Sequence, residues 1–432
     1  MMHTSDPGPL SRRDVLMHGG MALAASALTP FALGAPGALR PGEKRRIGLV
    51  GCGGRGGGAA ANALRADPDN VLVALGDLFP DMLQNTLNGL SGDAELAPRI
   101  DVPAERQFVG FEAYKQVVDS CDVVLFCTTP HFRPMHVEYA VQQGKHMFVE
   151  KPVAIDAPGL RRIWAASDEA KRKGLTLVSG LCYRYEKKKQ ETVKRVHEGA
   201  IGDIVALECS YNTGGLWHRG RKDNWSDMEW QIRNWLYHTW LSGDHVMEQA
   251  IHNLDKIAWV MGDKPPASVD ASGGRIVRTD PIYGNVFDHF NARFTWEGGL
   301  KCFFSCRQWS GAKPDVSDHV YGTKGVAHIQ SHKIEGENPW RWRTPEGMTD
   351  DMYQNEHNEL FQALREGRQI HNGDYMCQST LMALMTRMSA YTGQEISWTQ
   401  ALESQEDLSP AAYEWGDIAV GPIAQPGVTK FV

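Results

Sequence analysis

A glycine-rich turn between an apolar run and an alanine-rich segment is the feature that most limits what this chain can fold into. Residues 46–50 have the composition of a short buried strand and lead directly into Gly-Cys-Gly-Gly-Arg-Gly at 51–56. A helical pattern follows at 59–64, and a second apolar run at 71–75 ends close to Asp77. Strand, glycine turn, helix, strand and acid in this order are typical of a parallel βαβ unit that binds a dinucleotide. The sequence therefore predicts an α/β Rossmann fold with a doubly wound parallel sheet.

The residues of the loop have different predicted roles in cofactor binding. Gly51 permits the tight turn, Gly53 lets backbone amides approach the pyrophosphate, and Gly56 lets the helix pack closely on the strand. Asp77 lies 21 residues beyond Gly56, where a carboxylate binds the ribose hydroxyls and repels a 2′-phosphate, so NAD is favoured. The positive charge of Arg55 leaves NADP possible. The loop residues assigned to the cofactor are Gly51, Gly53, Gly54, Arg55 and Gly56.

Two further apolar runs indicate additional parallel strands. Residues 123–127 end at Thr128-Thr129-Pro130-His131, and residues 145–149 end at Glu150-Lys151-Pro152, with a helical pattern at 136–143 between them. In doubly wound sheets ligands bind beyond the carboxyl ends of the strands, which is where both polar segments fall. Both segments are therefore candidate contacts for the cofactor or the substrate.

With these motifs the chain resembles the glucose–fructose oxidoreductase / inositol dehydrogenase / MocA (Gfo/Idh/MocA) family. The resemblance rests on the loop at 51–56, on Thr129-Pro130 with His136, and above all on Glu150-Lys151-Pro152. It implies that Lys151 lies beside the nicotinamide and the reacting hydroxyl as a catalytic residue. A lysine after a strand is by itself more often a solvated charge, although burial in a cleft can tune its pKa. The other cofactor contacts that the resemblance implies are Thr129, Pro130, His136 and Glu150.

The second half of the chain has a different pattern. Strands are predicted at 203–211, 268–277, 286–296, 300–309 and 327–329, and helices at 186–198, 355–366 and 377–392. Hairpin-linked strands make an antiparallel sheet with one face for packing. We expect a dinucleotide-binding domain at 43–172 and, at 173–432, an α+β substrate and oligomerisation domain with a large, open, mainly antiparallel sheet. In the family such a sheet commonly serves oligomerisation, which implies a homodimer or homotetramer.

The segment 243–255 is predicted to be one helix that carries the proton-transfer group. Glu248, His252 and Asp255 lie at i, i+4 and i+7 and share one face. An acid one turn from a histidine suits proton transfer, because the imidazole takes a hydroxyl proton as hydride leaves carbon and the carboxylate orients the ring. The family's second motif is glycine-rich and ends Asp-x-x-x-His, which implies His252 and Glu248 as catalytic residues, with Glu replacing Asp.

Two other interpretations of this segment stay open. It departs from the family at Asp244 and Ala250, where glycines are usual, and His252 could be a packing histidine beside a solvated acid. His245, Glu248 and His252 also lie at i, i+3 and i+7, which is compatible with a metal-binding face. An obvious fourth ligand is lacking and the family uses no metal here, so no metal is expected.

Tryptophans are concentrated between residues 217 and 240, where five of the thirteen lie among arginines, histidines and aspartates. Flat apolar faces beside forked hydrogen-bonding groups suit a sugar ring. A packed subdomain or a subunit contact would have the same composition. The residues predicted to bind substrate, here and elsewhere in the chain, are Arg184, Tyr185, Trp217, Trp225, Arg233 and Asp255.

The N-terminal stretch has the features of an export signal. Arg12-Arg13 precedes a segment at 15–39 that lacks Asp, Glu, Lys and Arg and contains a run of small residues at 21–27. This pattern describes a cleaved signal rather than a membrane anchor, and the paired arginines resemble the twin-arginine type. We expect residues 1–38 to be read by the twin-arginine machinery, giving a periplasmic or exported protein with no membrane segment. A disordered tail with a chance arginine pair is the alternative.

Composition excludes several classes of protein. The 432 residues carry 45 basic and 52 acidic side chains, so there is no general positive field for nucleic acid. The eight cysteines are scattered without a Cys-x-x-Cys pair, and neither a disulfide framework nor a cysteine-based zinc site is expected.

Together these features predict an exported oxidoreductase that transfers a hydride between a ring carbon of a sugar, glycoside or polyol and NAD. Because free nicotinamide cofactor is scarce outside the cytoplasm, we expect the cofactor to be held tightly. The alternative is an NAD-dependent, redox-neutral glycoside hydrolase that oxidises C3 transiently, eliminates the aglycone and then reduces the sugar again. A non-catalytic sugar-binding protein with the same fold is a third reading, and it would carry no bound nucleotide.

Overall fold

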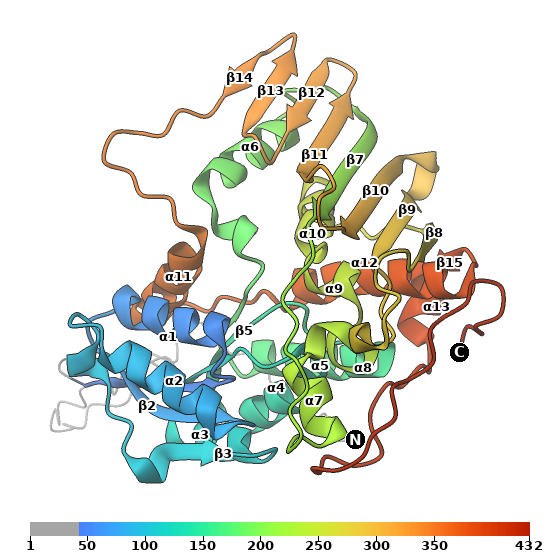
Figure 1. Ribbon diagram of the computed structural model, residues 1–432. Helices are drawn as coiled ribbons and strands as arrows, with labels where there is room; N and C mark the ends of the chain where they lie inside the picture. The colour runs from blue at the N-terminus through green and yellow to red at the C-terminus, as the bar shows by residue number, and fades with distance from the viewer. Residues whose placement is uncertain (1–42) are drawn as a thin grey trace, which may run out of the picture. The chain divides into compact units, whose positions relative to one another are not determined.

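The first sheet of the computed structural model, which describes residues 43–432, is a parallel sheet of six strands (Figure 1). Its order is β3-β2-β1-β4-β5-β6, and every neighbouring pair is parallel. The order reverses between β1 and β4, which is where doubly wound sheets bind their ligands. The Rossmann prediction is confirmed. The strands are β1 (Arg45–Val50), β2 (Asn70–Asp77), β3 (Gln107–Val109), β4 (Val123–Phe126), β5 (His146–Val149) and β6 (Leu177–Ser179).

Helices cover both faces of this sheet. They are α1 (Gly54–Ala66), α2 (Pro80–Ser91), α3 (Ala113–Ser120), α4 (Arg133–Gln142) and α5 (Ala157–Arg172). The sixth strand, β6, lies beyond residue 172, so the first sheet extends past the boundary that we drew between the two domains. The reason is that β6 follows a turn after α5 and pairs with β5 in parallel, which completes one more crossover of the same sheet.

The second sheet has nine strands in the order β14-β13-β12-β11-β7-β10-β9-β8-β15. All its pairs are antiparallel except β7 with β10. The prediction of a mainly antiparallel sheet is confirmed, and the one parallel pair makes the sheet mixed. Burial alternates along its strands, since one face packs on helices and the other does not. The strands are β7 (Ile204–Thr213), β8 (Ser268–Gly274), β9 (His289–Thr295), β10 (Lys301–Gln308), β11 (Asp315–Gly322), β12 (Gly325–His328), β13 (Lys333–Gly336), β14 (Trp340–Arg341) and β15 (Ile396–Ser397).

The helices of the second half connect the two sheets. They are α6 (Lys187–His197), α7 (Asp227–Arg233), α8 (Thr239–Ser242), α9 (His245–Glu248), α10 (Ile251–Val260), α11 (Met352–Glu366), α12 (Gly373–Thr392) and α13 (Trp398–Glu403). Short 3-10 turns lie at Ala97–Arg99, Ala104–Arg106, Pro130–Phe132, Cys182–Tyr185, Trp235–Tyr237, Pro281–Tyr283 and Glu297–Gly299. Helix α11 packs against α1, and α12 contacts both α5 and β8, so one hydrophobic core runs between the sheets.

The single helix predicted over 243–255 is wrong, because the chain forms α9 and α10 with a break at Gln249. The amide of His252 donates to the Gln249 carbonyl at 3.4 Å, one residue short of the α-helical partner. That partner, the Glu248 carbonyl, accepts a hydrogen bond from Lys151 Nζ instead. A side chain 97 residues away in sequence therefore interrupts the helical hydrogen-bond ladder.

Asp244 begins α9 in a backbone conformation that favours glycine, with φ of 83°. Its buried carboxylate accepts hydrogen bonds from the amides of His245 (2.6 Å) and Phe287 (2.7 Å) and from the Tyr391 hydroxyl (2.6 Å). These bonds compensate for the strained backbone and for the buried charge. They explain how an aspartate occupies a position whose backbone conformation favours glycine.

No helix among residues 43–432 is long and apolar enough to cross a bilayer. The predicted signal segment, residues 1–38, lies outside the described residues.

Candidate active site

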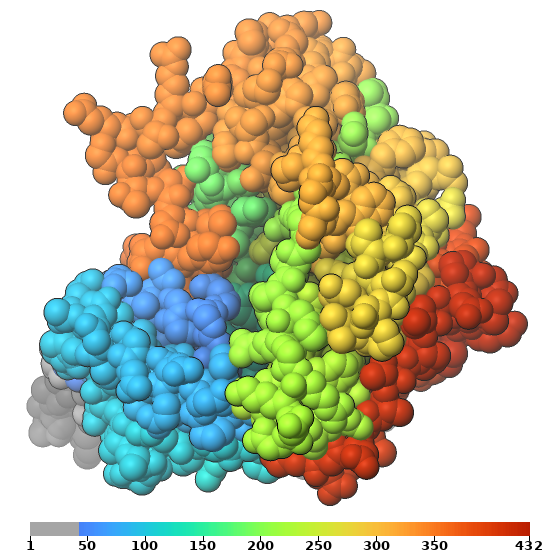
Figure 2. Space-filling view, viewed as in Figure 1, coloured from blue at the N-terminus to red at the C-terminus, as the bar shows by residue number. Residues whose placement is uncertain are grey.

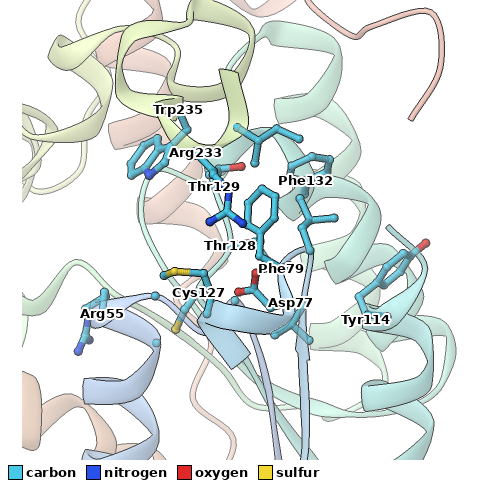
Figure 3. Close-up of a pocket in the computed structure, with 18 of the residues that line it drawn as sticks. Arg55, Asp77, Phe79, Tyr114, Cys127, Thr128, Thr129, Phe132, Arg233 and Trp235 are labelled. Carbon is cyan, nitrogen blue, oxygen red and sulfur yellow. Dashed lines mark hydrogen bonds between the residues drawn. The ribbon is translucent and has the colours of Figure 1, made fainter. Parts of the chain in front are cut away.

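A cavity of about 420 Å³ opens at the carboxyl ends of β1, β2 and β4 (Figure 3). The predicted cofactor residues that line it are Gly51, Gly53, Gly54, Arg55, Gly56, Asp77, Thr129 and His136. Pro130 is buried at the start of a 3-10 turn and lines neither this cavity nor the next one described. The structure thus brings residues from four separate sequence segments to the reversal point of the sheet.

The shape of the glycine loop fits a dinucleotide. A Cβ on Gly56 would lie 1.9 Å from the Gly51 carbonyl oxygen, so this glycine is required for helix α1 to approach β1. A Cβ on Gly53 would meet nothing within 4 Å, which leaves the start of α1 open toward the cavity. The hydroxyl of Thr129 is buried without a partner on the same side, as expected of a group that bonds a ligand.

Asp77 is held rigidly at the end of β2. One carboxylate oxygen accepts from the Cys52 amide at 2.6 Å and the other from the Phe79 amide at 2.9 Å. Burial raises the pKa of Asp77 above its ordinary value, and these two amide bonds oppose that shift. A fixed, half-buried carboxylate that retains lone pairs toward the cavity suits ribose hydroxyls and disfavours a 2′-phosphate.

Arg55 points away from Asp77 and toward the other end of the cavity. Its guanidinium forms ion pairs with Glu150 and, at 2.6 Å, with Glu356 of α11, and it lies 4.7 Å from the ring centroid of Tyr353. Burial by itself would raise the pKa of Glu150. Three nearby positive charges outweigh that effect and hold the pKa below its ordinary value: Arg55, Lys151 and Arg133. Because Glu150 and Glu356 already occupy its guanidinium, Arg55 gives no reason to expect NADP.

A second cavity of about 320 Å³ adjoins the first, and both are lined by Arg55, Cys127, Thr128, Thr129 and Trp235. Lys151, Glu248 and His252 lie together in its wall. Lys151 Nζ is 3.2 Å from a Glu248 carboxylate oxygen and also donates to the Glu248 backbone carbonyl. The ammonium group is thus fixed where β5 ends and α9 breaks.

His252 is neutral in this environment. Burial, and after it the nearby Lys151, lowers the pKa of His252 well below the ordinary value of 6.5. Its Nδ1 atom is buried without a hydrogen-bond partner, and its ring lies 5.0 Å from that of Tyr183. A neutral imidazole beside a fixed ammonium can accept a proton from a hydroxyl that the ammonium binds.

Comparison with known families agrees with this geometry. Residues 45–179 match the model of the oxidoreductase family with an NAD-binding Rossmann fold, and residues 190–328 match the GFO/IDH/MocA C-terminal domain. The chain belongs to the Gfo/Idh/MocA family. Its first half is the NAD-binding Rossmann unit of that family, which supplies the glycine loop and Asp77 to the first cavity.

Individual relatives are distant. The 2,7-anhydro-N-acetylneuraminate hydratase of Escherichia coli is 25% identical over 55% of this chain, and a glycosyl hydrolase family 109 protein of Porphyromonas gingivalis is 28% identical over 39%. The matches span 59% and 34% of those two relatives, so the chain aligns with less than two thirds of either. The inositol 2-dehydrogenase of Rhizobium meliloti is 22% identical over 67% of this chain and 76% of its own length.

Solved structures show the same fold. Levoglucosan dehydrogenase in complex with NADH superposes with a TM-score of 0.64 and 17% identity, covering 82% of this chain and 99% of that one. Aldose-aldose oxidoreductase from Caulobacter crescentus has a TM-score of 0.63 and 19% identity, covering 82% of this chain and 100% of that one.

Three residues that we predicted to bind substrate are instead part of the interior of this Gfo/Idh/MocA chain. Arg184 forms ion pairs with Asp255 at 2.9 Å and with Asp263 at 2.6 Å. The hydroxyl of Tyr185 donates to Asn372 at 2.6 Å. None of Arg184, Tyr185 and Asp255 lines either cavity. Arg184 and Tyr185 lie in the 3-10 turn at Cys182–Tyr185, and Asp255 is buried in α10, where it pairs with Arg184.

The tryptophan-rich loop also lies elsewhere than expected. Trp217 and Arg233 line the first cavity, opposite the glycine loop, and Trp225 lies 4.8 Å from the Arg233 guanidinium. Trp217 and Arg233 thus line the first cavity alone, Trp225 lines neither cavity, and Trp235 of the same loop lines both. The side chains that accompany Lys151 and His252 are Tyr211, Trp235, Gln249 and Tyr353.

Most of these companions could not have been found from sequence. Tyr211 lies two residues before the end of β7, and Tyr353 lies in the first turn of α11. Nothing in their local pattern distinguishes them from packing aromatics. Gln249 directly follows Glu248 and is the one residue that the motif itself could have indicated.

The metal interpretation of this segment does not match the geometry. His245 lies behind the cavity, bonded to Asp244 at 3.1 Å and 3.4 Å from Cys306 Sγ, while Glu248 and His252 line it. Among the described residues, no group of three or more His, Cys, Asp or Glu side chains is arranged to hold a metal ion.

Proposed function

We propose that this protein is an NAD-dependent oxidoreductase that transfers a hydride between a ring carbon of a sugar, glycoside or polyol and the nicotinamide. The observation that carries the proposal is that Lys151 and His252 line one cavity, which shares the walls Thr128 and Thr129 with the cofactor cavity. The similarity to an inositol 2-dehydrogenase supports a cyclic polyhydroxy substrate.

The residues have separate roles in the proposed reaction. Bound NAD would accept the hydride from the substrate carbon. Lys151, fixed by Glu248, donates a hydrogen bond to the reacting hydroxyl and stabilises negative charge on its oxygen as the C–H bond breaks. His252, kept neutral by burial and by Lys151, receives the hydroxyl proton. In the reverse direction the same two groups return the proton and hold the carbonyl oxygen.

The test is a comparison of Lys151→Met and His252→Asn with the exposed control Lys313→Met. Purified full-length chain is incubated with NAD and a panel of inositols, aldoses and glycosides, and NADH is followed at its absorbance band. Each of the two site variants should lose about 100-fold or more in kcat while still binding NADH, whereas the control should not change. Unimpaired turnover in both site variants would overturn the mechanism.

A second candidate function is supported by the similarity to a glycosyl hydrolase family 109 protein. Transient oxidation at C3, elimination of the aglycone across C1 and C2, addition of water at C1 and return of the hydride to C3 would use the same lysine and histidine with no net change in cofactor. The product distinguishes the two: a freed aglycone without accumulated NADH indicates hydrolysis, and a ketone or lactone indicates net oxidation.

We also propose that the protein is exported through the twin-arginine pathway and assembles as a homodimer or homotetramer. The support for export is Arg12-Arg13 ahead of an uncharged segment. The support for assembly is the free face of the nine-stranded sheet, where Val205 and Phe303 are 55% and 52% exposed. We expect the double variant Arg12→Lys, Arg13→Lys to be retained in the cytoplasm. We expect Phe303→Lys to have the mass of a monomer in solution.

A further inference from the structure

A segment from the second half of the chain forms the outer wall of the cofactor cavity. Trp217, Arg219, Ile232, Arg233 and Trp235 line it opposite Asp77 and the glycine loop. Figure 2 shows this yellow-green segment packed on the blue and cyan first half. The adenosine end of a bound dinucleotide would therefore lie between two parts of the protein rather than on an open sheet edge.

Arg233 joins these two parts directly. Its guanidinium forms two hydrogen bonds with the carboxylate of Asp81 on α2, at 3.0 and 2.9 Å. The guanidinium lies 3.8 Å from the ring centroid of Phe79, which is beside it in Figure 3, and 4.8 Å from that of Trp225, and the Arg233 side chain is only 9% exposed. A paired, stacked guanidinium with little exposure makes a stronger contact than an ordinary surface ion pair.

The C-terminal tail fastens the same segment from outside. The Trp415 ring lies 4.9 Å from Phe111 and 5.5 Å from Phe79, both on the Rossmann side. The Gly416 carbonyl accepts from the Met228 amide at 3.0 Å, and the Ile418 carbonyl accepts from the Gln231 side chain at 2.9 Å. The tail thus bonds α7 while packing on the first half.

These contacts form a separate hydrophobic cluster beside the cofactor cavity. Its buried members come from both halves of the chain: Phe79, Phe132, Met228, Ile232 and Leu241, with Tyr413 and Ile418 of the tail packed against them. The hydroxyl of Tyr413 also pairs with His131 at 2.8 Å. If α7 moved away from the cavity, this cluster would become exposed and the Arg233–Asp81 ion pair would break at the same time.

We propose that residues 217–235 and the tail at 413–418 form a clamp that retains NAD(H) in its cavity between turnovers. This proposal rests on the proposed function and deepens it. Arg233, which was predicted from sequence to bind substrate, instead holds the clamp closed over the adenosine end of the cofactor. The tail lies outside both segments that match the family models, 45–179 and 190–328, so it is a feature of this chain that those models do not describe.

The experiment measures release of NADH from the purified full-length chain. Protein is isolated without added cofactor, denatured, and assayed for released nucleotide; exchange is then timed by the loss of NADH fluorescence when excess NAD is added. We expect close to one nucleotide per chain and an exchange time longer than one turnover. Arg233→Ala should accelerate nucleotide exchange at least 10-fold. Asp81→Asn and Trp415→Ala should also accelerate it.

The matched control is Arg293→Ala, which removes an exposed ion pair with Asp270 (2.8 Å) on the nine-stranded sheet. It should leave the exchange rate unchanged. The melting temperature of each variant distinguishes an opened clamp from general destabilisation. If Arg233→Ala does not fold, the exchange rates of the variants at the exposed residues Trp415 and Asp81 still test the proposal.

The outcomes distinguish the two proposals. A chain that binds NAD but exchanges it equally fast in the wild type, in all three clamp variants and in the control has no clamp, while the proposed oxidoreductase function stands. A chain that neither retains nor binds NADH refutes the proposed function itself.

Discussion

Replacing Gly53 by alanine tests whether the open side of the glycine loop holds the cofactor's pyrophosphate. Gly53 has φ of −75° and ψ of 179°, a conformation that alanine adopts without strain, and its added Cβ would meet nothing within 4 Å. The folded protein should therefore keep its stability within about 1 kcal/mol, because the freedom that the unfolded chain loses is offset by the poorer N-cap that alanine makes for α1. The methyl group would instead project into the cavity and displace the phosphates from the start of α1.

The expected size of the effect follows from the lost contacts. A hydrogen bond between a backbone amide and a charged oxygen contributes about 1.5–3 kcal/mol, so losing one weakens NADH binding by about 10- to 100-fold. Gly56→Ala is the contrasting variant, because its Cβ would lie 1.9 Å from the Gly51 carbonyl oxygen. The backbone must move to relieve that overlap, at a cost of about 1–3 kcal/mol of folding stability.

The assay combines NADH titration by fluorescence with thermal unfolding of the nucleotide-free protein. Gly53→Ala should raise Kd without lowering the melting temperature, and Gly56→Ala should lower the melting temperature. An unchanged Kd for Gly53→Ala would place the pyrophosphate elsewhere and refute the cofactor site. A fall in its melting temperature as large as that of Gly56→Ala would show that the space beside Gly53 is not open.

Three further predictions follow from the buried ionisable groups. The fall of kcat/KM on the acid side should occur below pH 6.5, because burial and Lys151 lower the pKa of His252. In the residual activity of Lys151→Met this fall should occur at a higher pH, because the positive charge beside His252 is gone. Asp255→Asn should lower the free energy of unfolding by about 3 kcal/mol, because it leaves the guanidinium of Arg184 with one carboxylate. KM should not change, and a change in KM without destabilisation would show that Asp255 binds substrate. Burial lowers the pKa of His238 to about 3, so the folded state stays neutral while the unfolded state takes up a proton below pH 6.5. Stability should fall as the pH drops from 7, by about 2 kcal/mol from this residue at pH 5, and His238→Asn should show a correspondingly smaller slope in denaturant titrations.

Features set by neighbouring residues were predictable. The glycine loop, Asp77 and the strand that ends at Glu150 lie where their local patterns indicate, because turn geometry and apolar runs specify a βαβ unit within a short stretch. The mainly antiparallel second sheet followed from strands of alternating polarity in the same way, although its one parallel pair, β7 with β10, did not.

Features set by contacts between distant residues were not predictable. The helical pattern at 243–255 is regular, yet the segment breaks because the Lys151 ammonium takes the Glu248 carbonyl. The tryptophan-rich loop has a composition that suits sugar, yet it covers the cofactor cavity, since Arg233 pairs with Asp81. Arg184 has the character of a binding residue, yet two acids of the second half neutralise it in the core.

The sequence by itself therefore determined the class of chemistry: a dinucleotide loop, a lysine after a strand and a histidine on a later helix are written in short motifs whose backbone consequences are local. Only the tertiary structure decided which side chains surround that chemistry. A strand end, a helix start and a chain terminus hundreds of residues apart meet through packing, and the free energy of each such contact depends on burial and on partners that no local pattern contains.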